Sequence, residues 1–199
     1  LFSKCFLISL ILSINLRSAT ITQIVGFSGS MASEGYGERK SNVALSNFGS
    51  WVDDRVIAIG AEQNDQNGNN TGRVYIHKKD DLWGWGVFAE IGGKQTDEFF
   101  GNSLDINTSG SVVIAGAPEN DNSSGTNAGQ VRVYKWNYDN EVYVRYDNNG
   151  VPINTRYPQW GSDISGPSEN TYFGTSISIA QYSTPLTFAV GGLGHNNYT

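Results

Sequence analysis

Two polar loops hold the residues best suited to bind a ligand. Residues 62–72 read EQNDQNGNNTG and residues 119–129 read ENDNSSGTNAG, and each loop follows an apolar run that ends in Gly-Ala or Gly-Ala-Pro. Hard cations such as calcium take several oxygen ligands from alternating residues. The sequence therefore offers a calcium site with these oxygen donors: Asp65, Asn67, Asn69, Glu119 and Asp121. The alternative is that Asn, Asp and Gly simply build exposed turns.

Asn-x-Ser/Thr sequons offer a second use for such loops. They lie at Asn69, Asn107, Asn122 and Asn197. Glycosylation at these positions requires a eukaryotic source and export of the chain. Glycan display therefore competes with metal binding as a role for the loop tips.

Catalytic chemistry has little support in the sequence. The histidines are His77 and His195, and His77 occupies a strand position that corresponds to Tyr134, which indicates a structural role. The adjacent carboxylates Asp97 and Glu98 lack an evident partner and are expected in a solvated turn. No nucleophile elbow, phosphate loop or histidine-rich metal motif occurs. We expect a protein that is not an enzyme and has no cofactor other than calcium.

The composition and the N-terminus indicate an exported protein that does not bind nucleic acid. The chain has 199 residues and a net charge of −6, and it lacks the clustered Lys and Arg that phosphate binding needs. Lys4 precedes the apolar run CFLISLILSINL, which is too short to span a bilayer and is typical of a signal peptide. We expect a signal peptide over residues 1–19 and a secreted or cell-surface domain over residues 20–199. The alternative for the first segment is a buried strand or a retained anchor.

Similar sequence segments, called phrases below, recur along the chain. VIAIGAEQND at residues 56–65 matches VVIAGAPEND at residues 112–121, and FAVGG at residues 188–192 continues the series. An aromatic-glycine pair precedes the second and third phrases, and Tyr36-Gly37 stands in this place before the first. Glycines at such positions allow close packing of backbones. The residues expected to hold these units together are Gly60, Phe100, Gly101, Gly116, Ala117, Pro118, Phe173, Gly174 and Gly191.

The sequence pattern of each repeated unit predicts short strands separated by turns. SLDI and SISI alternate in polarity, SVVIAGA is continuously apolar as in a strand covered on both faces, and NTSG and DNNG are turn sequences. A segment near residues 83–91, or 159–164, is expected to add a fourth strand. We predict an all-β fold, a partial β-propeller of about 2.5–3 four-stranded blades. The expected blades cover residues 36–91, 92–160 and 161–199.

These phrases resemble the FG-GAP repeats that form the β-propeller of integrin α subunits and occur in many secreted and cell-surface proteins. The matching residues are Phe100-Gly101 with Gly116-Ala117-Pro118, and Phe173-Gly174 with Gly191-Gly192. The resemblance covers residues 36–199 and implies a ring of about seven blades, so further blades of the same chain would be needed to close it. Residues 107–111 read NTSGS where integrin-type blades carry an Asp-rich calcium loop, so that site is not carried over.

The resemblance predicts a non-catalytic extracellular recognition or adhesion module. Such a module binds a protein or a glycan through loops on one face, as repeat architectures allow. The alternatives are an accessory or substrate-binding propeller of a secreted hydrolase and a purely structural surface protein, because propellers host many functions.

Aromatic side chains are further candidates for ligand contact. Phe100, Phe173, Trp136 and Trp160 are expected in the core, where bulky aromatics pack blades together. The residues LWGWG, which include Trp83 and Trp85, fit a core and an exposed binding position equally well.

Overall fold

The protein is all-β. Its structure, a computed structural model, describes residues 8–11, 23–27, 34–37, 42–46, 55–80, 84–136, 145–146, 152–153, 157–181 and 185–194. These residues form strands, turns and irregular segments, with no helix among them. Accordingly, the described part of the chain contains no helix long and apolar enough to cross a membrane.

The first large sheet is an antiparallel meander of four consecutive strands. These are β3 (Val43–Leu45), β4 (Val56–Ala61), β5 (Arg73–Asp80) and β6 (Gly84–Gly92). Every residue of β4 is buried, which explains its uninterrupted apolar sequence. β6 occupies the place expected for a fourth strand.

The second large sheet has the strand order β12-β9-β8-β7. Its strands are β7 (Ser103–Ile106), β8 (Val112–Ala117), β9 (Gln130–Lys135) and β12 (Ile164–Ser165). β8 is buried along its whole length, like β4. The turn expected at NTSG joins β7 to β8, with Gly110 at a φ of 72°. β12 lies beyond residue 160, so this sheet extends past the boundary expected from the sequence.

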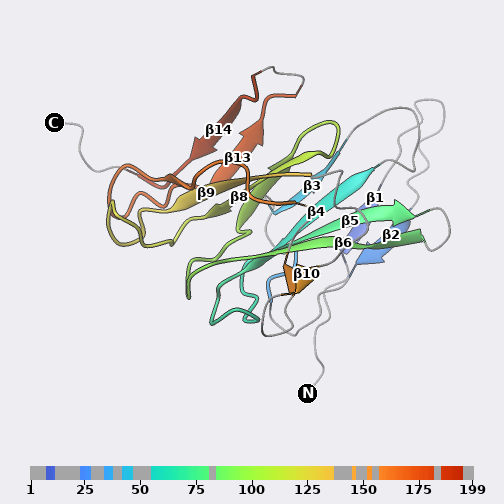
Figure 1. Cartoon of the computed structure of the whole chain (residues 1–199), viewed down its shortest axis with the longest axis horizontal. Helices are drawn as coiled ribbons and strands as arrows, with labels where there is room; N and C mark the ends of the chain where they lie inside the picture. Colours follow the sequence, from blue (N-terminus) through green and yellow to red (C-terminus); the bar gives the residue numbers. More distant parts are fainter. Residues whose placement is uncertain are drawn as a thin grey trace.

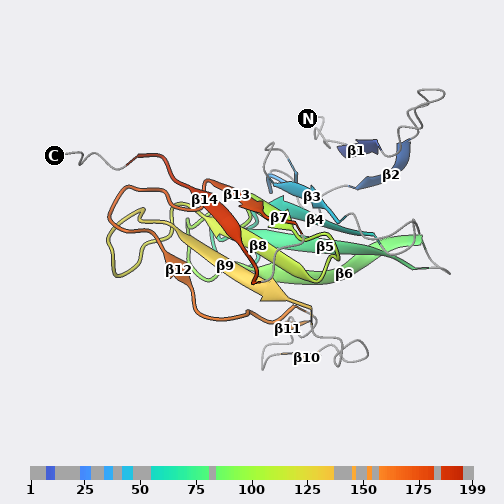
Figure 2. The same ribbon diagram turned by 90° about the horizontal axis from the view of Figure 1, so that it is seen from above.

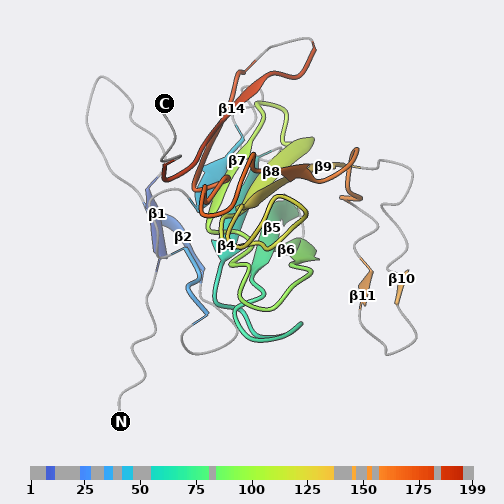
Figure 3. The ribbon, with the colours of Figure 1, turned by 90° about the vertical axis from the view of Figure 1, so that its left-hand side faces the viewer.

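Three strand pairs complete the described structure. β13 (Ser176–Ile179) and β14 (Phe188–Gly191) form a hairpin beside the second sheet. β1 (Ile8–Ile11), inside the segment expected to be a signal peptide, pairs with β2 (Gln23–Phe27). β10 (Arg145–Tyr146) pairs with β11 (Pro152–Ile153), and this pair lies apart from the large sheets in Figure 3.

The two sheets and the β13–β14 hairpin stack as layers with apolar side chains between them. Figures 1 and 2 show the hairpin, then β8 and β9, then β4 and β5 in spatial order. One cluster joins Val56 and Ile76 of the first sheet to Val113 of the second. A separate cluster joins Val133 of the second sheet to Ile179 of the hairpin. Burial of such aliphatic side chains supplies the main force that holds the layers together.

Glycines let the backbones of neighbouring layers approach closely. A Cβ atom on Gly60 would lie 2.0 Å from the carbonyl oxygen of Gly101, and one on Gly116 would lie 2.1 Å from that of Gly174. Gly60 and Gly116 have no positive φ, so the close contact itself requires glycine. The first sheet therefore meets the second through the same contact by which the second meets the hairpin.

The aromatic-glycine pairs supply the other side of this contact. Their glycines share a positive φ of 63° at Gly37, 86° at Gly101 and 97° at Gly174. Each of these glycines also donates its N–H to the glycine of the Gly-Ala or Gly-Gly pair in its own layer. The three bonds are Gly37 to Gly60 at 2.7 Å, Gly101 to Gly116 at 2.9 Å and Gly174 to Gly191 at 3.0 Å. Tyr36-Gly37 thus occupies the same structural position as the two Phe-Gly pairs.

Candidate functional site

Four polar loops lie at one end of the layers. In antiparallel sheets every second connection between strands lies at the same end of the strands. This loop end consists of residues 62–72, 93–102, 118–129 and 166–175, which connect the strands of the two sheets and lead into the hairpin. Backbone hydrogen bonds join the loops in pairs: Asp97 N–H donates to Asn69 O at 2.8 Å, and Asn170 N–H donates to Thr126 O at 2.8 Å. The loops of each pair are therefore held to each other, and the loop end is not a set of independent loops.

The two aspartates predicted as metal ligands close turns in their own loops. Asp65 Oδ1 accepts the backbone N–H of Asn70 at 2.7 Å, and Asp121 Oδ1 accepts that of Asn127 at 2.8 Å. Asn70 and Asn127 have φ values of 46° and 49°, a left-handed conformation that asparagine tolerates better than most residues. These contacts agree with the turn-building alternative for the two loops.

The remaining predicted ligands do not converge with these aspartates on one polar centre. Asn67 Oδ1 accepts from Arg73 Nη2 at 3.3 Å, and its Nδ2 donates to Gly93 O at 3.2 Å. The side chains of Asn69 and Glu119 are exposed. Within the described ranges, no three His, Cys, Asp or Glu side chains gather in a way that would hold a metal ion. A cation beside Asn67 would face the Arg73 guanidinium, so calcium binding by this set stays a prediction.

A buried ion pair lies beneath the second sheet's loops. Glu98 and Arg132 have side-chain exposures of 0% and 1%, and Arg132 Nη1 and Nη2 donate to the two carboxylate oxygens at 2.9 and 2.6 Å. Burial alone would lower the Arg132 pKa, but the hydrogen bonds and charge of Glu98 raise it above its ordinary value. Removing one partner of such a pair costs about 3–5 kcal/mol, because the other charge stays buried. Arg132 thus fixes the position of the Glu98 carboxylate through both of its oxygens.

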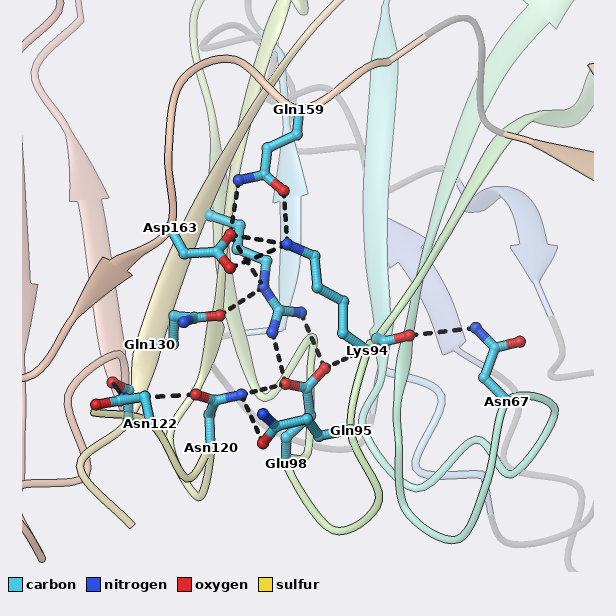
Figure 4. A network of polar contacts seen from close by, with 12 residues as sticks. Asn67, Lys94, Gln95, Glu98, Asn120, Asn122, Gln130, Gln159 and Asp163 are labelled. Atoms are coloured by element: carbon cyan, nitrogen blue, oxygen red, sulfur yellow. Dashed lines mark hydrogen bonds and ion pairs between the residues drawn. The ribbon is translucent and has the colours of Figure 1, made fainter. Parts of the chain in front are cut away.

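Polar side chains extend this ion pair toward solvent (Figure 4). Lys94 Nζ contacts the Asp163 carboxylate oxygens at 2.9 and 3.0 Å, and Arg132 Nε lies 3.7 Å from Asp163 Oδ1. Partial burial raises the Asp163 pKa, but hydrogen bonds from Lys94 and Gln159 outweigh it and leave the pKa below its usual range. The network joins the loop at residues 93–102 to the segment that precedes β12.

Asparagines attach the buried Glu98 and Glu34 to the neighbouring loops. Asn120 Nδ2 donates to Glu98 Oε2 at 2.6 Å in the second sheet. Asn64 Nδ2 donates to Glu34 Oε2 at 2.7 Å in the first. Tyr75, where the second sheet has Arg132, donates its hydroxyl to Glu34 Oε2 at 3.3 Å. Corresponding asparagines therefore anchor the loop after β4 and the loop after β8 to buried glutamates.

The structure places His77 in the interior, in agreement with a structural role. Its exposure is 5%, and Nε2 lies 2.6 Å from the Tyr36 hydroxyl oxygen. Burial lowers the His77 pKa to about 4. Burial, with the nearby Tyr75 and Glu34, raises the Tyr36 pKa above its ordinary value. His195 lies outside the described residues.

The aromatic predictions are correct for the interior positions and wrong for Trp160. Phe100 and Trp136 are buried, and Phe173 is half-buried against the cluster between the second sheet and the hairpin. Trp160 is 48% exposed, with Lys135 Nζ 4.9 Å from its ring centroid. It lies at the edge of the second sheet, next to the isolated bridge between Gln159 and Tyr134, and within the described ranges no strand pairs beyond this edge. In the LWGWG segment, Trp85 is half-buried and Trp83 lies outside the described residues.

Sequence reasoning missed Glu98 and Arg132. Glu98 was expected in a solvated turn with Asp97; Asp97 is exposed, but Glu98 is buried. The sequence does contain a signal for the burial of Arg132. Alternation in QVRVYKW assigns Arg132, Tyr134 and Trp136 to one face of the strand. An arginine on an aromatic face requires a buried acidic partner.

The sequons differ in accessibility. Asn69 is exposed, Asn107 and Asn122 are half-buried, and Asn197 lies outside the described residues.

The loop end, taken as a whole, presents amides and carboxylates on a rigid base. Its exposed acidic side chains are Asp65, Asp97, Glu119, Asp121 and Glu169. Such a surface can bind a partner by hydrogen bonds and charge, whereas the buried Glu98 beneath it is already paired with Arg132. In comparisons with known proteins, no family model matches the chain and no curated protein matches it significantly.

Proposed function

We propose that the chain is a segment of an FG-GAP-like β-propeller that serves as a non-catalytic extracellular recognition module. The loop end is the proposed binding face, and the proposed partner is an extracellular protein or glycan. The sheets and the hairpin are the blades of this propeller, and further blades of the same chain would complete the ring.

The glycine contact between successive layers carries this proposal. Gly60 against Gly101, and Gly116 against Gly174, set successive layers in one relative placement. A constant placement of layers is what a radial array of blades needs. It also brings the loop after β4 and the loop after β8 to the same end, although their sequences differ. Constant strands with variable loops are the usual basis of recognition in repeat proteins.

A binding screen tests the proposal. The whole chain, checked for β-structure by circular dichroism, is applied to glycan arrays and extracellular protein arrays, with calcium and with a chelator. For any ligand found, Gln66→Arg and Ser123→Arg alter exposed loop-end positions in the two sheets. Each is expected to weaken binding at least about tenfold if its loop forms part of the contact.

Gln181→Arg is the matched control. Gln181 is also exposed, but it follows β13 at the opposite end of the layers. Binding should be unchanged in this variant. Equal loss in all three variants, or no binding by a folded chain, would contradict the proposal, and turnover of a bound glycan would favour the accessory domain of a hydrolase.

A further inference from the structure

Asn69 presents a free amide at the loop end. Its side chain is exposed, and within the described ranges no hydrogen bond engages it. Its backbone is fixed, because Asn69 O accepts the N–H of Asp97 at 2.8 Å. A group attached to Nδ2 would therefore extend into solvent without breaking a contact of the fold.

Asn107 uses its amide to form the turn between β7 and β8. Its Oδ1 accepts the N–H of Val112 at 2.9 Å, and its Nδ2 donates to Ser111 Oγ at 3.2 Å. A bulky group on Nδ2 would displace Ser111 and loosen a turn that joins two core strands.

Asn122 is more tightly engaged. Its Nδ2 donates to Gly129 O at 3.0 Å and to Asn120 Oδ1 at 3.4 Å, and its Oδ1 accepts the N–H of Ser124 at 2.9 Å. Both Nδ2 protons point at protein oxygens, so a sugar on this nitrogen must break at least one of these bonds.

We propose that Asn69 is the N-glycosylation site that the described part of the chain carries in its folded form, because a sugar on Asn107 or Asn122 would break bonds of the fold and keep the chain from reaching it. This inference rests on the export included in the proposed function. In the transfer, Nδ2 of Asn69 bonds to the anomeric carbon of an oligosaccharide and loses one proton. The bond from that carbon to a lipid pyrophosphate breaks, and the pyrophosphate leaves with the electron pair. The glycan then projects from the loop end itself, beside Asp97.

The timing of this transfer follows from Thr71, the hydroxyl residue of the same sequon. Thr71 has an exposure of 0%, and its Oγ1 donates to Gly68 O at 2.8 Å. An enzyme that must contact this hydroxyl can reach it only before the loop closes. Asn69 is therefore modified during translocation, before the chain folds.

Translation with endoplasmic-reticulum membranes tests the inference. One arm uses the chain as it stands, and a second arm places an established secretory leader before it. Translocation is scored by protection from added protease. Site occupancy is scored by mass spectrometry after enzymatic glycan release in ¹⁸O water, which labels each formerly glycosylated asparagine. Asn69→Gln is the variant, and Asn107→Gln is its control.

The arm with the secretory leader tests which asparagine is glycosylated, and the arm without it tests whether the chain itself directs export. Protected, folded chains of the leader arm should carry a glycan at Asn69, lose it in Asn69→Gln and keep it in Asn107→Gln. Protected chains that lack a glycan at Asn69, or folded chains modified at Asn107 or Asn122, would overturn the inference. If only the chain without the leader is digested by protease, the proposed export is contradicted. The leader arm then still tests glycosylation of Asn69.

Discussion

Glu98 and Arg132 form an ion pair inside the protein. His77 is buried there in its neutral form. The ion pair is satisfied by two direct hydrogen bonds and by Asn120, so it sets the position of the loop that contains Glu98. His77 stays neutral because its ring is buried against Tyr36. At the scale of single residues, Glu98, Arg132 and His77 therefore contribute to the fold through their contacts in the interior.

The neutral state of His77 makes stability depend on pH. Its pKa is about 4 in the folded protein and about 6.5 in the unfolded chain, so the unfolded chain binds the proton more strongly. The stabilisation is fully present above about pH 6.5 and is lost as the pH falls toward 4, by on the order of 3 kcal/mol. Urea unfolding measured at several pH values across this window should show the decline.

His77→Gln should reduce this pH slope, even if it lowers stability at every pH. An identical slope in His77→Gln and the parent chain would show that other groups cause the decline.

At the scale of strands and turns, local sequence predicted most of the described elements. The apolar runs at residues 56–61 and 112–117 are β4 and β8, which are buried on both faces. SLDI and SISI are β7 and β13. These elements follow local patterns because strand formation here depends on alternation and on glycine-containing turns.

The exposed tryptophan and the ion pair depend on information that local sequence lacks. Trp160 is exposed because of where its segment lies in the sheet, and its own neighbours in sequence do not reveal that edge. Glu98 and Arg132 are 34 residues apart and meet only through the stacking and pairing of strands. Both outcomes depend on tertiary placement, which overrides residue-type preferences.

Gly116→Ala tests the contact between layers. The added Cβ would meet Gly174 O at 2.1 Å, and backbone oxygen cannot move aside as a flexible side chain can. We expect a loss of about 1–3 kcal/mol or more in the free energy of unfolding, measured with urea. Gly86→Ala in β6 is the control, because a Cβ there meets nothing within 4 Å, and it should stay within about 0.5 kcal/mol of the parent. Equal effects at both glycines would contradict the close-contact explanation.

At the scale of the whole molecule, burial decreases from the two large sheets to the hairpin. β4 and β8 are entirely buried, whereas β13 and β14 contain exposed and half-buried residues except at Ile179. Local opening costs least where few apolar side chains are buried. The layers should therefore differ in how readily they open, although one chain forms all of them.

Hydrogen exchange followed by mass spectrometry measures this difference. Peptides that contain β4 or β8 should exchange most slowly, and those from β13 and β14 should exchange faster. β5 and β9 are internal controls, because each is paired on both edges. A hairpin protected as strongly as β8 would mean that the layers open as one cooperative unit.

The contact of Gly60 with Gly101, and of Gly116 with Gly174, involves backbone atoms only. Gene duplication can therefore reproduce this contact at each new seam from the glycines alone, while the apolar side chains between the layers must still fit one another. Point mutations in the loops leave that seam intact, whereas most substitutions of its glycines disrupt it. Selection on such a chain would act strictly on a few glycines and permit wide divergence of the loops between them.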